Sequence, residues 1–260
     1  MQKTLAHPAK FLIITIAAAL TSALLRSLAL CFSFEGNYFT NAPLSILQKV
    51  FTVVALAALI LLPLIATWRA PVLATEPKDH APFTKLGAAL AAISLFLCFI
   101  SACTANSSLS LPVMIIAIAF PSLLGGIVYF ILHFLRGSTS ATVRVAFGSV
   151  LLLALAALVC LTYFDIGTQM NAPHKISQHV ALLSVMLWLL YDMRAAAGSP
   201  RPRMQAALTP AAIFLCLSYG VSNMIGYIAG KYTSSLFLAT DLFLLVLVPY
   251  MVARTKELYN

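Results

Sequence analysis

Eight long apolar runs constrain the fold of this chain more than any other feature. They lie at about 11–33, 44–68, 86–105, 111–135, 143–164, 177–193, 206–229 and 235–253. Most approach the roughly 20 helical residues that cross a hydrocarbon core about 30 Å thick. The runs are continuous and do not alternate between apolar and polar residues, which argues against a β-barrel. The sequence therefore predicts an all-α integral membrane protein with about eight transmembrane helices.

The composition supports the same class, because 62% of the residues are hydrophobic and only 9% are charged. Soluble domains carry roughly 25% charged residues. The first run follows Lys3 and Lys10 and resembles a secretory signal, but it continues to about residue 33, which is too long for the apolar region of a signal peptide. We therefore expect an uncleaved first span. The longest connection, at about 69–85, leaves no room for a second domain.

The distribution of Lys and Arg predicts the topology. With eight spans and a cytoplasmic N-terminus, the outer segments hold four basic residues, Arg26, Lys49, Lys175 and Lys231, and the cytoplasmic segments hold twelve. This split predicts that both termini are cytoplasmic, and we expect a bacterial cytoplasmic membrane. The net charge of +9 then matches the anionic inner leaflet. The sequence contains no basic stripe interleaved with aromatic residues, so we do not expect nucleic acid as a partner.

An internal repeat becomes visible when the chain is aligned with itself at an offset of 130 residues. Segments 34–49 and 164–179 then share six identities in sixteen positions, including Asn-Ala-Pro at 41–43 and 171–173. Roughly one or two identities would be expected by chance for this composition. The repeat predicts two parallel four-helix units, 1–130 and 131–260, related by an axis along the membrane normal.

The repeated motif, F-[ED]-x5-N-A-P-x4-Q-[KH], falls in the outer connections of both units. Its polar positions are Glu35, Gln48 and Lys49 in the first copy and Asp165, Gln178 and His179 in the second. In a structural interpretation, Glu35 pairs with Lys49 and Asp165 with His179, and Asn and Pro open the next helix. In a functional interpretation, both copies line a polar vestibule that admits a solute from outside.

Two charged residues lie within the predicted spans at the same outer depth, Arg26 and Asp241. Ionisable groups at membrane depth usually face protein or water, because lipid exposure costs at least a few kcal/mol. Asp241 has no local partner and is the best candidate for a functional acid, with a structural pair to Arg26 or Lys231 as the alternative. Asp192 and Arg194, at the other end of the sixth run, are expected to be solvated.

Small residues follow one stripe of the seventh run, at Ser218, Ser222, Gly226 and Gly230. Such a stripe lets a second helix approach closely. A broken helix at a substrate site, between residues 220 and 230, is the alternative interpretation.

The sequence carries no motif for a phosphate loop, a metal site or a serine hydrolase, so we expect neither a cofactor nor a metal, and an enzyme is the least favoured reading. The five cysteines lie within the spans and are interpreted as packing residues. The leading hypothesis is a small permease or permease subunit with an outward-facing polar vestibule, whose partners are the bilayer and a small solute. The alternative is a scaffold or sensor subunit that binds another membrane protein through the stripe in the seventh run.

Overall fold

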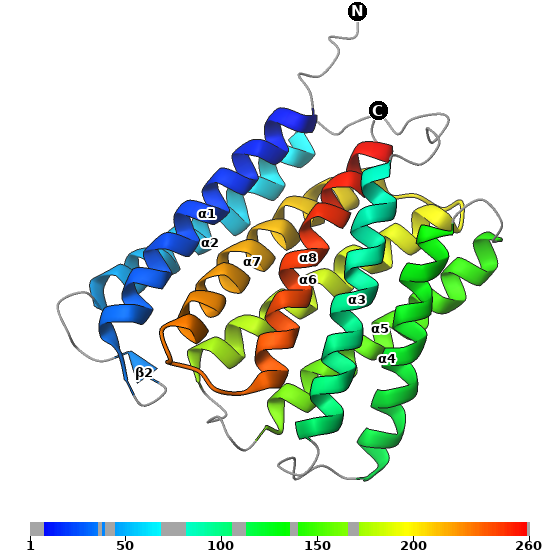
Figure 1. Cartoon of the computed structure of the whole chain (residues 1–260). Coiled ribbons are helices and arrows are strands. Elements are labelled where there is room, and N and C mark those ends of the chain that lie inside the picture. Colours follow the sequence, from blue (N-terminus) through cyan, green and yellow to red (C-terminus); the bar gives the residue numbers. More distant parts are fainter. Residues whose placement is uncertain are drawn as a thin grey trace, which may run out of the picture.

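The chain forms a bundle of eight long helices in the computed structural model, which describes residues 8–35, 38–39, 45–68, 82–105, 113–135, 140–165 and 172–258. The helices are α1 (Pro8–Ser33), α2 (Ser45–Trp68), α3 (Pro82–Ala105), α4 (Val113–Phe134), α5 (Ala141–Tyr163), α6 (Pro173–Ala196), α7 (Pro202–Ile228) and α8 (Ser235–Leu258). All eight are long and apolar enough to cross a membrane. This confirms the predicted class and number of spans. Helix α1 begins and α8 ends at the same end of the bundle (Figure 1).

Three helices begin several residues before the apolar runs that predicted them. Helices α3, α6 and α7 start at Pro82, Pro173 and Pro202. Proline suits the first helical turn, where its missing N–H would have no intrahelical acceptor. The polar residues that follow these prolines belong to the helices but not to the apolar runs, so hydropathy alone placed the boundaries too late.

A β-hairpin with two strands of two residues each follows α1, and the sequence did not predict it. Strand β1 (Phe34–Glu35) pairs antiparallel with β2 (Tyr38–Phe39), with Phe34 opposite Phe39. Lys231 donates from Nζ to the Phe34 carbonyl at 2.9 Å. This contact ties the end of α1 to the connection between α7 and α8.

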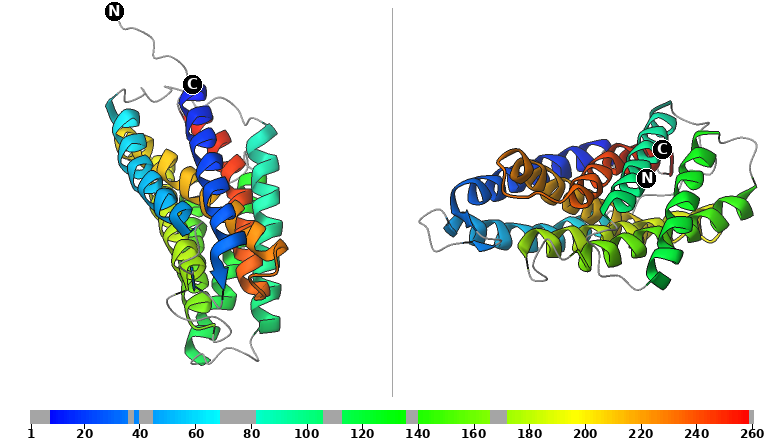
Figure 2. Two further views of the ribbon diagram at one scale, coloured as in Figure 1. Left: turned by 90° about the vertical axis from the view of Figure 1, so that its left-hand side faces the viewer. Right: turned by 60° about the horizontal axis from the view of Figure 1, so that its bottom comes forward.

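Helix α7 is the centre of one half of the bundle, because it packs on α1, α2, α6 and α8. Helices α3, α4 and α5 form the opposite edge, where α3 packs on both α8 and α4 (Figure 1). The α1–α2 hairpin is thus attached to the rest of the bundle mainly through α7. Figure 2 shows this hairpin as one edge of an elongated cross-section.

The packing of the helices does not test the predicted repeat. Within the described ranges α5 packs on α6 as α1 does on α2, and α7 packs on α8 as α3 does on α4, but α7 also packs on α1 and α2, where α3 has no comparable contact with α5 or α6. The Asn of each motif copy, Asn41 and Asn171, lies outside the described residues, so their equivalence is not tested. Ala172 takes the N-cap position of α6 without a side-chain cap. The two units 1–130 and 131–260 stay a prediction from the sequence.

Candidate functional site

A pocket of about 290 Å³ lies where α1 and α2 meet α6 and α7. Helix α2 contributes the residues from Gln48 to Leu59, which extend over roughly 16 Å at a rise of 1.5 Å per residue. Helix α6 contributes Pro173, Ile176, Ser177 and Val180 from its first two turns. The pocket therefore runs from the end of the bundle at which α2 and α6 begin toward its middle.

The pocket opens sideways, between α2 and α6. Its lining residues Leu56 and Ile176 have 57% and 51% of their surface exposed, so they stand at its mouth. Helix α2 packs on α1 and α7 but not closely on α6, which leaves the gap. In a bilayer this mouth would face lipid chains rather than water.

Arg26 of α1 forms the polar part of the pocket wall. Its side chain is 1% exposed, and its Nη2 donates to Ser177 Oγ of α6 at 3.0 Å. The guanidinium carbon lies 4.7 Å from the centre of the Tyr219 ring and 5.6 Å from that of Phe51. Such contacts between a cation and aromatic faces stabilise the charge by about 0.5–2 kcal/mol. They do not supply acceptors for the remaining N–H groups.

Several buried polar atoms around Arg26 lack hydrogen-bond partners within the described part of the chain. They are Arg26 Nε and Nη1, Gln48 Oε1, Gln178 Oε1, Asn223 Oδ1, His174 Nδ1 and the Tyr232 hydroxyl. Burial raises the pKa of Tyr232, which lies between α7 and α8, so this phenol stays protonated. Buried polar groups in native proteins nearly always have a protein or water partner. Their concentration here indicates a place for water or a polar ligand.

Asp241 of α8 faces the interior, as the cost of lipid exposure predicts, and is 1% exposed. Its expected partner Arg26 makes no ion pair with it, although their charges lie close enough to interact. Asn223 of α7 donates to Asp241 Oδ1 at 3.2 Å instead. Asp241 does not line the pocket. Arg26 therefore lines the cavity, whereas Asp241 lies in the protein interior outside it.

The six polar residues of the motif lie in different surroundings. Gln48 lines the pocket, while Gln178 lies on the buried side of α6 and donates to the Phe237 carbonyl at 3.0 Å. Glu35 and Lys49 are exposed, and within the described part of the chain no ion pair joins them.

In the second copy of the motif, His179 Nε2 lies 2.9 Å from Thr162 Oγ1. Asp165 contributes its backbone carbonyl, which accepts from Lys175 Nζ at 3.1 Å. His179 therefore contacts Thr162 and not Asp165, so the expected staple between Asp165 and His179 is not formed.

The small-residue stripe of α7 is used inside the chain. Ser218 and Ser222 are fully buried, and a Cβ added to Gly226 would collide with the Tyr232 ring. Gly230 does not belong to the stripe, because α7 ends at Ile228 and Gly230 follows it with a φ of +68°. A positive φ is typical of the residue that closes a helix.

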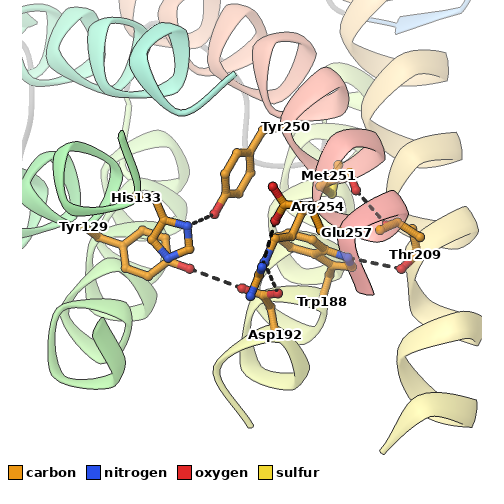
Figure 3. Close-up of polar contacts among 10 residues, drawn as sticks. Tyr129, His133, Trp188, Asp192, Thr209, Tyr250, Met251, Arg254 and Glu257 are labelled. Carbon is orange, nitrogen blue, oxygen red and sulfur yellow. Dashed lines mark hydrogen bonds and ion pairs between the residues drawn. The ribbon is translucent and has the colours of Figure 1, made fainter. Parts of the chain in front are cut away.

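A second polar network lies at the other end of the bundle, and the sequence did not reveal it (Figure 3). Arg254 of α8 donates from Nε to Asp192 Oδ1 of α6, and from Nη1 to Glu257 Oε2, both at 2.9 Å. The Tyr129 hydroxyl donates to Asp192 Oδ2 at 3.5 Å. Asp192 is 1% exposed, so the expectation of a solvated residue is wrong. The separation of 62 positions between Asp192 and Arg254 hid the pair.

The aromatic side of this network is closed as well. Tyr250 Oη lies 2.7 Å from His133 Nδ1, and Trp188 Nε1 donates to Thr209 Oγ1 at 3.2 Å (Figure 3). The adjoining void, lined by Phe130, Trp188 and Tyr250 among others, holds only about 10 Å³. That space is about the minimum for one water. This end of the bundle is a packed polar core, and the Arg26 pocket is the better candidate for a ligand site.

The residues that the structure describes contain no cluster of three or more His, Cys, Asp or Glu side chains that would hold a metal. Comparison with known proteins gives no match: no family model, no curated protein and no solved structure is similar to this chain.

Proposed function

We propose that this polytopic membrane protein is permease-like and binds an anionic solute in the Arg26 pocket. The observation that carries the proposal is the state of Arg26. Its guanidinium is buried, lines a cavity, and has two nitrogens, Nε and Nη1, without acceptors among the described residues. A buried cation without a directly paired anion is costly, and an anionic ligand would offset that cost.

Arg26 is the one charged side chain in the described lining of the pocket, and its charge suits an anion better than a cation. The Ser177 hydroxyl accepts from Arg26 and donates to the His174 carbonyl at 2.7 Å, while Tyr219 and Gln48 add uncharged polar groups to the wall. The acid of this region, Asp241, is bonded to Asn223 and does not reach the cavity. A cation entering the pocket would therefore meet Arg26 with no carboxylate to receive it.

The position of the pocket supports a path from one side of the membrane. It begins at the first turns of α2 and α6, the helices that follow the two motif copies. The distribution of Lys and Arg predicts that this end lies at the outer face. The vestibule proposed here is smaller than the sequence suggests, because Gln48 alone of the six polar motif residues lines it.

A scaffold function through the α7 stripe receives less support. Ser218, Ser222 and Gly226 are buried within the bundle, so this stripe is not available to a second membrane protein.

Binding can be tested on the purified protein in nanodiscs of phosphatidylcholine, which carries no net charge. Thermal unfolding would be followed with panels of anionic, uncharged and cationic solutes. We expect anions alone to raise the unfolding temperature, and Arg26→Gln to abolish the shift. Lys49→Gln, at an exposed cation of the same end, should keep it. Stabilisation by uncharged solutes or cations that survives Arg26→Gln would contradict the proposal. Flux of the best anion into proteoliposomes then tests permeation.

A further inference from the structure

We infer that the ligand of the Arg26 pocket is a single-chain anionic amphiphile, which enters sideways from the bilayer with its carboxylate or phosphate at Arg26 and its chain between α2 and α6. This inference rests on the proposed anion site and names the class of ligand. It follows from the shape of the pocket, the division of its lining and the depth of Arg26.

The lining is polar at one part and apolar along the rest. The polar lining residues are Arg26, Gln48, Thr52, Ser177 and Tyr219. The apolar lining comes from both walls and consists of Phe51, Ala55, Leu56 and Leu59 on α2 and of Ile176 and Val180 on α6. Ligand sites bury apolar ligand surface against such walls and use a few polar groups for orientation. A small hydrophilic anion would leave most of this lining without a partner.

The mouth of the pocket indicates the route of the ligand. Thr52, Leu56, Ile176 and Val180 line the cavity and are also exposed on the face that would contact lipid. The neighbouring surface of α2 is apolar, with Val53 and Ile60 exposed by 67% and 60%. A ligand dissolved in the bilayer therefore reaches the cavity without passing through water.

The depth of Arg26 favours a small headgroup on a single chain. Arg26 precedes the end of α1 by about two turns, or roughly 10 Å. Side chains of a helix point toward its N-terminus, which here directs Arg26 further from that end. A phospholipid with its phosphate at the membrane surface would not reach the guanidinium. The volume of about 290 Å³ is at the low end for a ligand site and fits a compact headgroup with the first part of one chain.

The test compares four kinds of probe on the protein in phosphatidylcholine nanodiscs. Dodecanoate and dodecyl phosphate carry charge and chain, acetate and inorganic phosphate carry charge alone, dodecanol carries a chain alone, and phosphatidylglycerol carries charge on two chains. We expect dodecanoate and dodecyl phosphate to bind at least about tenfold more tightly than the other probes, and only when Arg26 is present.

Two further variants separate the pocket from the general surface of α2. Thr52→Trp places a large ring at the mouth and should weaken dodecanoate binding at least about tenfold. Val53→Trp, on the lipid-facing side of the same turn, should leave it unchanged. Because Thr52 is exposed, this pair keeps the test decisive if Arg26→Gln fails to fold.

Each of the following outcomes would overturn a specific part of the proposal. Equal, Arg26-dependent binding of acetate and dodecanoate, unaffected by Thr52→Trp, would overturn the amphiphile and leave the anion site standing. Equal binding of phosphatidylglycerol would overturn the single chain. Binding of none of the anions in an Arg26-dependent or Thr52-dependent way would overturn the proposed function itself.

Discussion

Arg254 and Asp192 form a buried ion pair between α8 and α6, with 2.9 Å between Nε and Oδ1 and with both side chains at most 5% exposed (Figure 3). Glu257 lies one helical turn after Arg254 and accepts from the same guanidinium. The pair links the end of the chain to the middle of the second half. It thereby closes the end of the bundle opposite the Arg26 pocket.

Removing one partner of this pair should destabilise the bundle strongly. Arg254→Gln leaves the Asp192 and Glu257 carboxylates buried without the cation that they share, and removing one partner of a buried ion pair typically costs roughly 3–5 kcal/mol. We expect a corresponding fall in the free energy of unfolding in detergent. The double variant Asp192→Asn/Arg254→Gln should recover part of the loss. Lys256→Gln, on the exposed side of α8, is the control and should leave the free energy of unfolding almost unchanged. Equal stability of Arg254→Gln and the wild type would contradict the pairing.

The contact between α3 and α8 depends on a glycine. A Cβ at Gly87 would lie 2.9 Å from the Cα of Tyr250, which belongs to the backbone of α8 and cannot rotate away. Gly87→Ala should therefore push the two helices apart and cost about 1–3 kcal/mol, as overpacking does. Unfolding in detergent would measure this cost. The matched control is Gly126→Ala, where a Cβ would lie at the same 2.9 Å but from the terminal methyl groups of Leu151 and Leu95, which can move; a larger effect there would argue against the backbone contact.

The Trp188 indole depends on one hydroxyl group for its hydrogen bond. Thr209→Val keeps the shape of the side chain and removes the acceptor, which leaves the buried Nε1 unpaired. The expected cost is about 1–3 kcal/mol of unfolding free energy. Thr209→Ser restores the hydroxyl and should recover most of it. If Val and Ser are equally tolerated, the hydrogen bond contributes nothing to stability.

Hydropathy predicted the class and the number of helices because a spanning helix must be apolar along its length, whatever its neighbours are. The boundaries shifted at Pro82, Pro173 and Pro202, where polar first turns belong to the helices, and at the end of α8, which continues past the apolar run to Leu258. The order of packing was not predictable in the same way. Apolar side chains are equally stable against lipid and against other helices. The composition of α7 therefore does not show that it packs on four other helices.

The candidate site was predictable in part, and the physical reason is the cost of charge within a membrane. That cost singled out Arg26 and Asp241 from one sequence, and both are buried near each other. It did not predict that Asn223 would take the place of Arg26 at Asp241, since an amide carries no charge to draw notice. The pairing of Glu35 with Lys49 was not predictable from the motif, because exposed residues in β1 and in the first turns of α2 can keep the motif spacing without contacting each other.

The topology is a prediction that one pair of fusions can test. The twelve-to-four distribution of Lys and Arg places the connection between α5 and α6 outside and the C-terminus inside. A reporter fused after Gly167 should therefore be active on the outer side, and one fused after Asn260 on the inner side. If both fusions report the same side, the outer position of the Arg26 pocket is wrong.

Neutralising Asp241 should strengthen anion binding, whereas neutralising Arg26 abolishes it. The Asp241 carboxylate lies close enough to Arg26 for their charges to interact but outside the cavity, so it competes electrostatically with a bound anion. Asp241→Asn keeps the shape and removes the competing charge. We expect the dissociation constant of dodecanoate to fall by about 3- to 10-fold, the scale of one partly screened charge. Glu35→Gln removes an exposed acid at the same end and should change it little, because solvent screens that charge. Weaker binding by Asp241→Asn, with folding intact, would mean that Asp241 holds Arg26 in position, and the pocket would then depend on the pair and not on Arg26 alone.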